Sequence, residues 1–387
     1  MSNRFRPLSV PELRARECAK WRHYPADVLP LWVAEMDFAL ADAIKEAIKA
    51  HVDSDDLGYP PPNGMPGLRE TVAERFERRY GVAFPLDGVA SLGSTVDGMV
   101  LGCRAFTEPG DEVLLLTPLY PPFKRVVVEN GRVPVEVELV RGEERYGLDM
   151  DAVRAAVTPR TRMLMLCNPH NPIGIMYTRE ELAALAALVL EHDLWVVSDE
   201  LHADISYGGT HVPFASLGPD VAARTVTLYG PTKAFNFPGL GISFVLTGGP
   251  EVLERLEKAS GGKHSRPTRL AEAAALAAYR SCDDWLEQAL AYLRANRDRV
   301  VGFVNAELPG ASAHAPEATY LAWLDLRAAG LGDRPAERLA ELAKVGLNEG
   351  AEFGAGGAGF ARLNFATCHD VLEEALSRLA AALAPAA

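Results

Sequence analysis

Paired cysteines are absent from this sequence. Its five cysteines stand far apart and no two form a CxxC motif; they are Cys18, Cys103, Cys167, Cys282 and Cys368. Disulfide frameworks and zinc knuckles need cysteines at close, regular spacing, so the sequence excludes both classes. We expect reduced thiols and a cytoplasmic protein.

Long hydrophobic runs and an excess of positive charge are absent as well. No stretch of about 18 uncharged apolar residues occurs, which excludes a membrane span. Residues 1–21 are polar and lack the apolar core of a signal peptide. The chain has 39 Lys and Arg against 52 Asp and Glu, a formal net charge of −13. Nucleic acid and anionic lipid are therefore poor partners, and we expect a small molecule instead.

Short apolar runs alternate with helical patterns through the first part of the chain. The chain has 387 residues, more than the roughly 250–300 at which a single core stops growing, so two domains are expected. The apolar runs show no polar alternation, as is typical of strands buried on both faces; they are residues 111–120, 162–170, 194–200, 224–230 and 242–249. The pattern predicts an α/β fold whose large domain has a mostly parallel wound sheet.

Helical patterns set the expected domain boundaries. Residues 178–193 have helical periodicity and begin with Thr178 three residues before Glu181, the spacing of a capping box. Residues 269–308 form one long helical pattern, which predicts a helix that leaves the first domain and continues into a second. We expect an N-terminal segment (1–45) that joins the small domain, a large domain (46–284) and a smaller α+β domain (285–387).

Lys233 is the strongest candidate for chemistry. It follows the apolar run at 224–230 and lies among Pro231, Phe235 and Phe237, so we expect partial burial. Most lysines are solvated surface residues, and that interpretation is the alternative. Burial lowers the pKa of an amine and makes it a usable nucleophile and base. The pattern therefore favours a covalent bond from Lys233 to a carbonyl cofactor.

Two further apolar runs end in groups that a pyridine ring would need. Asp199 lies near the end of the run at 194–200, where a carboxylate can keep a ring nitrogen protonated. His202 can donate a hydrogen bond to a phenolic oxygen, and Asn171, in a double Asn-Pro turn, can reach that oxygen and a substrate carboxylate. The alternatives are a helix cap for Asp199, a structural histidine, and plain turn chemistry for Asn171.

Residues 91–106 supply the groups that a phosphate needs. Gly93 permits close approach, Ser94 and Thr95 add hydroxyls, and the following residues predict a helix. Because a helix N-terminus attracts anions, this stretch is a candidate phosphate site.

Two more side chains complete the candidate site. Tyr120, at a predicted strand end, can stack on a flat cofactor or pack in the core. Arg362 lies between apolar neighbours in a strand-like run, where a guanidinium suits the carboxylate of a substrate.

Two glycine-containing segments resemble nucleotide motifs by letter only. Residues 354–359, GAGGAG, match GxGxxG, but that fingerprint follows a strand and opens a helix, whereas here the glycines precede the strand-like run FARLNF. The segment GPTK lacks the GxxxxGK[ST] frame of a P-loop. We expect a loop at 354–359 and no nucleotide site.

Seven motifs, in family order, resemble fold type I pyridoxal phosphate (PLP) enzymes of the class I/II aminotransferase group. Within that group the chain most resembles the MalY/PatB branch of cystathionine β-lyase-like C–S lyases. The motifs are LPLWVAEMDF (29–38), LGYPPPNGMPGLRE (57–70), NPHNPIG (168–174), SDELHAD (198–204), PTKAFNFPGL (231–240), ATYLAWLD (318–325) and FARLNFAT (360–367). The resemblance covers nearly the whole chain and implies the PLP-dependent transferase fold.

The resemblance also implies a PLP cofactor and a role for each matching residue. Lys233 would hold PLP as a Schiff base and move the Cα proton, Asp199 would pair with the pyridine nitrogen, and Tyr120 would stack on the ring as the third catalytic residue. The other implied contacts are His202 and Asn171 at the phenolic oxygen, Ser94, Thr95 and Thr232 at the phosphate, and Arg362 with Asn171 at the substrate α-carboxylate. Tyr59 would reach the phosphate of a neighbouring subunit, which implies a homodimer with shared sites.

The implied reaction is β-elimination from cystathionine or another cysteine S-conjugate, which releases a thiol, pyruvate and ammonia. Transamination, or a decarboxylation-coupled deamination, is the alternative on the same fold.

Two positions depart from the branch: Gly230 replaces the usual serine, and Glu35 replaces the aspartate of WVADMDF. These departures leave the natural substrate open. A regulatory or binding protein is the alternative of another class, and the joint presence of Lys233, Asp199 and Arg362 argues against it.

Overall fold

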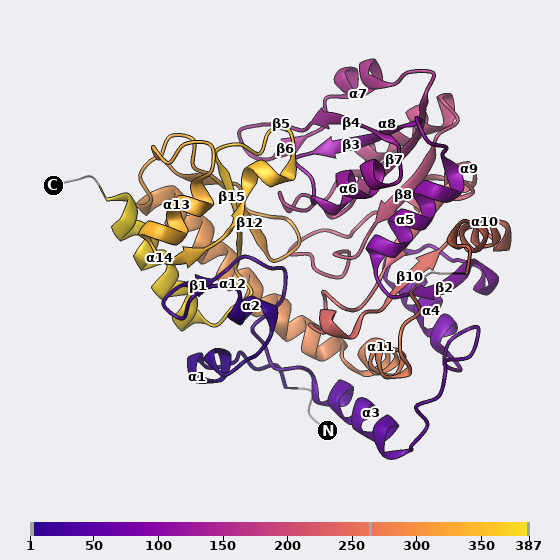
Figure 1. Ribbon diagram of the computed structural model, residues 1–387, viewed down its shortest axis with the longest axis horizontal. Coiled ribbons are helices and arrows are strands. Elements are labelled where there is room, and N and C mark those ends of the chain that lie inside the picture. The colour runs from indigo at the N-terminus through magenta and orange to yellow at the C-terminus, as the bar shows by residue number, and fades with distance from the viewer. Residues whose placement is uncertain (1–3, 263–264, 385–387) are drawn as a thin grey trace.

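The computed structural model describes residues 4–262 and 265–384, which build two main sheets of unequal size (Figure 1). The larger sheet has seven strands in the order β2-β10-β9-β8-β7-β3-β4. Strands β9, β8, β7, β3 and β4 run parallel, and β10 is antiparallel to β9 and β2. Their bounds are β2 (Val89–Leu92), β3 (Glu112–Thr117), β4 (Val133–Glu138), β7 (Thr161–Cys167), β8 (Trp195–Asp199), β9 (Thr225–Tyr229) and β10 (Ser243–Leu246). Each predicted apolar run overlaps one of these strands, and the predicted α/β fold is confirmed.

Helices cover both faces of this sheet. On β7, Met163 and Met165 belong to one core cluster, and Leu164 and Leu166 belong to the opposite one, because successive strand residues point to opposite faces. The first cluster packs under α5 (Thr95–Phe106), α6 (Pro122–Glu129) and α10 (Pro250–Ser260), and the second under α7 (Met150–Ala156), α8 (Arg179–Glu191) and α9 (Pro219–Ala222). Burial on both sides explains the continuous apolar runs.

The capping box predicted for the helix at 178–193 is present. The Glu181 N–H donates to the Thr178 hydroxyl at 3.2 Å, and the Thr178 N–H donates to the Glu181 carboxylate at 2.8 Å. These two bonds satisfy amides that the first turn of α8 leaves without helical partners.

A second, four-stranded sheet has the order β11-β12-β15-β14 and lies on the left in Figure 1. Its strands are β11 (Ser312–Ala313), β12 (Leu321–Asp325), β14 (Asn348–Glu349) and β15 (Phe360–Asn364), accompanied by α12 (Asp283–Glu307), α13 (Pro335–Leu342) and α14 (His369–Leu383). The N-terminal strand β1 (Leu29–Pro30) pairs in parallel with β13 (Val345–Gly346). Residues from both ends of the sequence therefore pack together beside this sheet.

Shorter or peripheral elements complete the described chain. They are α1 (Val10–Arg14), α2 (Ala19–Arg22), α3 (Asp42–Asp53), α4 (Leu68–Tyr80), α11 (Arg269–Ser281), β5 (Val140–Arg141), β6 (Tyr146–Gly147) and the 3-10 helices η1 (Leu86–Gly88), η2 (Phe214–Leu217), η3 (Pro238–Leu240) and η4 (Gly350–Phe353). Residues 354–359 form the predicted loop, followed by β15. Among the described residues, no helix combines the length and apolarity needed to cross a membrane.

The single long helix predicted over residues 269–308 is wrong. The structure has two helices, α11 and α12, separated at Cys282, whose backbone leaves the helical region (φ −119°, ψ 16°). Asp283 and Asp284 then occupy the first turn of α12, where acidic side chains stabilise a helix start. Asp283 also accepts a hydrogen bond from the buried Arg75 at 2.7 Å, a tertiary contact that helical periodicity does not reveal.

Candidate active site

A cavity of about 330 Å³ lies at the carboxyl ends of the parallel strands, where open α/β sheets bind ligands. Nine of the ten predicted site residues line it: Ser94, Thr95, Tyr120, Asn171, Asp199, His202, Thr232, Lys233 and Arg362. The tenth, Tyr59, is 100% exposed and lines a different surface pocket with Leu57 and Arg269. The structure thus brings together residues that are far apart in the sequence.

Lys233 reaches the cavity from the turn after β9. Its Nζ donates a hydrogen bond to the Ala34 carbonyl at 2.8 Å. Burial and, to a smaller extent, the positive charge of Arg362 lower the pKa of Lys233 to about 8, while Glu35 and Asp199 oppose the shift. A fraction of the amine is therefore neutral near pH 7, which a nucleophile or base requires.

Asp199 ends β8 on the neighbouring strand and is buried. Burial raises the pKa of its carboxyl to about 6, although hydrogen bonds from the Leu201 N–H and the Thr95 hydroxyl lower it. The Leu201 N–H lies 3.1 Å from Asp199 Oδ1. A buried carboxylate of this kind is stabilised by a cationic N–H in the cavity, such as a protonated pyridine.

His202 is buried and neutral. Burial lowers the pKa of its imidazole to about 3, and the charges of Lys233 and Arg362 act in the same direction. Its Nδ1 has no hydrogen-bond partner within the described chain. A neutral imidazole with an unsatisfied nitrogen is suited to a polar ligand atom in the cavity.

Arg362 enters from β15 of the smaller sheet. Its Nη1 donates to Asn171 Oδ1 at 2.8 Å, and its Nη2 donates to the Trp32 carbonyl at 3.1 Å and to Asn348 Oδ1. Burial lowers the pKa of Arg362 to about 10, so the guanidinium stays charged at neutral pH. Its Nε has no partner in the part of the chain that the structure describes, which leaves a donor for an anion.

The N-terminus of α5 forms one wall of the cavity. The Ser94 hydroxyl caps this helix by accepting from the Asp97 N–H at 3.1 Å. The amides of Thr95 and Val96 belong to the same first turn, where helical acceptors are missing, and both residues line the cavity. A Cβ at Gly93 would lie 2.5 Å from Ser265 Oγ and 2.9 Å from Ser265 Cβ, so a side chain here would displace Ser265. The wall fits a phosphate.

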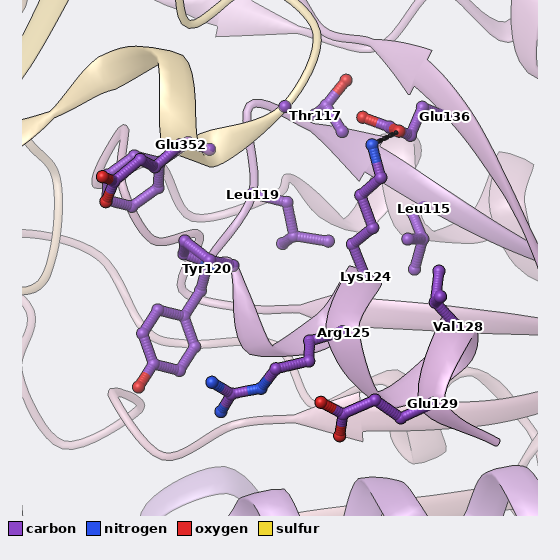
Figure 2. Close-up of a pocket in the computed structure, with 13 residues that line it drawn as sticks. Leu115, Thr117, Leu119, Tyr120, Lys124, Arg125, Val128, Glu129, Glu136 and Glu352 are labelled. Atoms are coloured by element: carbon purple, nitrogen blue, oxygen red, sulfur yellow. Dashed lines mark ion pairs between the residues drawn. The ribbon is translucent and has the colours of Figure 1, made fainter.

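Tyr120 follows β3 and lines both this cavity and a second one of about 370 Å³, whose lining residues Figure 2 shows. Burial raises the pKa of its phenol. The side chain is therefore a neutral aromatic wall at neutral pH, as stacking against a flat ligand requires.

Residues 26–379 match the family model described as Aminotransferase class I and II. The chain belongs to the class I and II aminotransferase family. It is 36% identical to cystathionine beta-lyase PatB of Bacillus subtilis over 92% of this chain and 93% of the relative. Among solved structures it is similar to OvoB (TM-score 0.92, 38% identity, 97% and 98% coverage) and to the PLP-bound C–S lyase of Staphylococcus hominis (TM-score 0.89, 30% identity, 96% of each chain).

In this aminotransferase-family chain, sequence reasoning missed the strap segment, which we define as residues 32–36. Trp32, Val33 and Ala34 of the strap segment line the cavity. The Ala34 carbonyl accepts from Lys233 and, at 3.0 Å, from the Tyr320 hydroxyl. Asn348, which binds Arg362, was missed as well. Trp32, Ala34 and Tyr320 lie inside the recognised motifs, but the motifs carry no signal for carbonyl contacts.

The two departures from the branch pattern have structural surroundings of their own. A Cβ at Gly230 would lie 3.2 Å from Ser243 Cα and 3.3 Å from the Ile242 carbonyl, so this turn has little room for a side chain. The Glu35 carboxylate pairs with Arg16 at 3.1 Å and opposes the fall in the Lys233 pKa. Within the aminotransferase family fold, both residues therefore act through local packing and charge.

Proposed function

We propose that this chain is a PLP-dependent C–S β-lyase acting on cystathionine or another cysteine S-conjugate. The observation that carries the proposal is one cavity lined by an amine of lowered pKa, a buried carboxylate and a buried guanidinium. Relatives named as cystathionine β-lyase and C–S lyase support the choice of reaction. Overall, the thioether and one water give a thiol, pyruvate and ammonia.

The cavity residues fit PLP. The Thr95 and Val96 amides with the Ser94 and Thr232 hydroxyls would bind the phosphate, and Asp199 would bind the pyridine nitrogen. His202 and the Asn171 amide nitrogen are the candidate donors to the phenolic oxygen, and Tyr120 would stack on the ring. When bound, PLP supplies an aldehyde for Lys233 and a ring that withdraws electrons from the substrate Cα.

Asp199 and Arg362 would set the orientation of the bound groups. The Asp199 carboxylate gains a cationic partner, which favours its ionised form. Arg362 would bind the substrate α-carboxylate through its unpaired Nε and its positive charge. Asn171, already bonded to Nη1, fixes the plane of the guanidinium.

Lys233 would move the proton that starts the reaction. Its neutral Nζ takes the proton from the substrate Cα, and the C–S electron pair leaves with the sulfur as a thiolate. The Ala34 carbonyl, 2.8 Å from Nζ, can hold the ammonium that results. The strap segment would cover Lys233 and limit the access of water.

We further propose a homodimer in the cytoplasm, with a large domain at 46–284 and a smaller domain at 285–387 that the N-terminal segment 1–45 completes. Tyr59 is fully exposed in one chain, which would allow it to contact the phosphate bound by a second copy. The predicted boundary at residue 285 falls in the first turn of α12. Five free thiols are consistent with a reducing compartment.

The test uses purified, PLP-loaded protein with L-cystathionine, assayed for pyruvate and free thiol with and without a 2-oxo acid acceptor. Product without acceptor supports β-elimination. Activity that needs the acceptor would instead make the chain an aminotransferase, the second candidate, which the matching family model favours. Absence of product in both arms, with cofactor bound, would contradict the proposed reaction.

A further inference from the structure

Arg362 is a buried guanidinium that forms no ion pair among the described residues. The oxygens that accept hydrogen bonds from its Nη groups are all uncharged; they are Asn171 Oδ1, the Trp32 carbonyl and Asn348 Oδ1. Burial lowers the pKa of Arg362 only to about 10, so the guanidinium keeps its charge at neutral pH. Because a buried charge without a counter-ion is costly, the site favours an anion that enters the cavity.

The other described side chains that contact Arg362 or act on its charge bring no negative charge to it. Tyr120 follows β3 and Tyr320 precedes β12, and burial raises the pKa of both phenols, so both are neutral at neutral pH. Phe353 of η4 lies against the guanidinium, with 5.0 Å between its ring centroid and Arg362 Cζ. An aromatic face attracts a cation without neutralising it. The charge of Arg362 is therefore held in place by neutral groups alone.

The pairing of β14 with β15 places Asn348 directly opposite Arg362, where side chains on one face of a sheet lie close together. The next residue, Glu349, points to the other face, because successive strand residues alternate. There its carboxylate accepts from the N–H groups of Ala336 and Glu337, at 3.1 and 3.3 Å, in the first turn of α13. Strand β14 thus turns its carboxylate away from the arginine and presents an amide to it.

An amide and a carboxylate at position 348 would leave different charges in the cavity. The oxygen of either group can accept from Arg362 Nη2, and the two side chains have nearly the same size and shape. The amide leaves the guanidinium with its full positive charge. A carboxylate would neutralise that charge from within the chain and would compete with the carboxylate of a ligand.

We propose that Asn348 is a specificity-determining residue, which positions Arg362 through a neutral acceptor and so leaves the positive charge available to the carboxylate of the substrate. The inference rests on the proposed function, in which Arg362 binds the substrate α-carboxylate. It adds a requirement at position 348 for a side chain that accepts a hydrogen bond and carries no negative charge.

The test titrates PLP-loaded protein with butyrate and with butyramide, two ligands of similar size that differ in charge and lack the amine needed for turnover. Ligand-observed NMR measures both dissociation constants. Wild-type protein should bind butyrate more tightly than butyramide. Asn348→Ala removes one acceptor without adding charge and should retain this preference. Asn348→Asp should reduce the preference by about tenfold or more, because the introduced carboxylate pairs with Arg362.

Asn130→Asp is the matched control for the change in charge. Asn130 accepts from Arg104 Nε at 2.5 Å on the surface, and neither residue lines the cavity. This variant therefore places a carboxylate beside a different arginine and should leave the preference for butyrate unchanged. Equal PLP content in all variants shows that each has folded with its cofactor site.

Equal preferences for butyrate in Asn348→Asp and Asn348→Ala would overturn the inference, because a residue that acts only through packing or its hydrogen bond gives the charged variant no special defect. Wild-type protein without a preference for butyrate would overturn it as well. The titrations need no turnover, so they are independent of the reaction. A wild-type protein that prefers butyrate but releases no pyruvate from L-cystathionine contradicts the proposed reaction and supports the role of Asn348.

Discussion

At the residue scale, burial shifts the two central groups in opposite directions. It lowers the pKa of Lys233 to about 8 and raises that of Asp199 to about 6, so each group is closer to neutrality than it would be in water. Perturbed groups of this kind cluster at functional sites. The shifts can be tested without any knowledge of the natural substrate.

Lys233→Ala should abolish the visible absorbance band of the bound cofactor and lower turnover by at least about 10²–10⁴-fold, because both the nucleophile and the base are lost. Absorbance spectra and pyruvate release measure the two effects. Lys258→Ala, at an exposed lysine of α10, is the control and should alter neither. A visible band that persists in Lys233→Ala would remove the amine from its proposed role.

The reaction of apoprotein with PLP should depend on pH through Lys233. Only the neutral amine attacks an aldehyde, and the pKa of about 8 means that the neutral fraction rises as pH rises through that value. Stopped-flow absorbance after adding PLP, recorded from about pH 6 to pH 10, should show a rate that increases with a midpoint near 8. A midpoint near the ordinary lysine value of 10.5 would contradict the burial of this amine.

Asp199→Asn should stabilise the apoprotein while weakening its affinity for PLP. The folded-state pKa of about 6 lies above the ordinary value of 3.8, so the contribution of Asp199 to stability is present below about pH 4 and is lost as pH rises through 6. At pH 7 the ionised carboxylate destabilises the fold by on the order of 3 kcal/mol, which the amide removes. Urea unfolding at pH 4 and pH 7 measures this difference, with exposed Asp333→Asn as the control.

At the element scale, a buried charge network joins helices to the sheet near the site. Arg75 on α4 donates to Asp283 of α12 at 2.7 Å, to Asp204 at 3.4 Å and to the Tyr229 hydroxyl at 3.2 Å. Its guanidinium also lies over the ring of Tyr279 in α11 at 4.7 Å. This network anchors the break between α11 and α12 and the end of β9, which precedes Lys233.

Arg75→Met should destabilise the fold by about 1.5–3 kcal/mol, because buried Asp204 would lose one of its two cations and keep only Arg79, at 2.7 Å. Urea unfolding at neutral pH measures the change. Arg78→Met provides the comparison: Arg78 also pairs with Asp283, at 3.2 Å, but its side chain is 61% exposed, so we expect less than about 1 kcal/mol. Equal, small effects of the two variants would show that the network contributes little.

The sequence predicted elements well where local patterns determine them and poorly where tertiary contacts do. The apolar runs become strands because burial on both faces demands them, and Thr178 caps α8 because the capping box is local. The helix break at Cys282 went unpredicted because residues 269–308 are continuously helical in pattern. The contact from Arg75 to Asp283 joins positions separated by 208 residues, beyond the reach of periodicity.

At the scale of the whole molecule, the proposed homodimer would build each site from residues of two chains, and mixing two inactive variants tests this arrangement. Lys233→Ala and Tyr59→Ala proteins should each be poorly active at limiting PLP. After the two are mixed, unfolded and refolded together, activity should return, because hybrid dimers contain one site with Lys233 from one chain and Tyr59 of the partner subunit. The control mixes Lys233→Ala protein with protein that carries both Lys233→Ala and Tyr59→Ala, and it should stay inactive. Failure to recover activity in the first mixture would contradict a shared site.

The candidate site was predicted in its side chains and missed in its main chain. Nine of the residues predicted from the motifs line one cavity. They could be predicted because their side-chain types match the chemistry that a cofactor needs. The hydrogen bond from Arg362 to the Trp32 carbonyl joins residues 330 positions apart. Because every residue type carries a backbone carbonyl, the residue at position 32 gives no sign that its carbonyl is the acceptor. Side-chain patterns cannot reveal such contacts; only the folded path of the chain does.

The strap segment is held by its main-chain carbonyls, so its contacts do not depend on which side chains it carries. Asn364 donates to the Val33 and Glu35 carbonyls at 2.7 and 2.8 Å, and Ala34 is held through its carbonyl by Lys233 and Tyr320. A chain could exchange the side chains at 33–35 and retain every one of these bonds, provided that the backbone path persists. Glu35, which replaces the aspartate of WVADMDF, is one such exchange: the carbonyl that accepts from the Lys233 amine belongs to the backbone of Ala34 and does not depend on which side chain stands at 35.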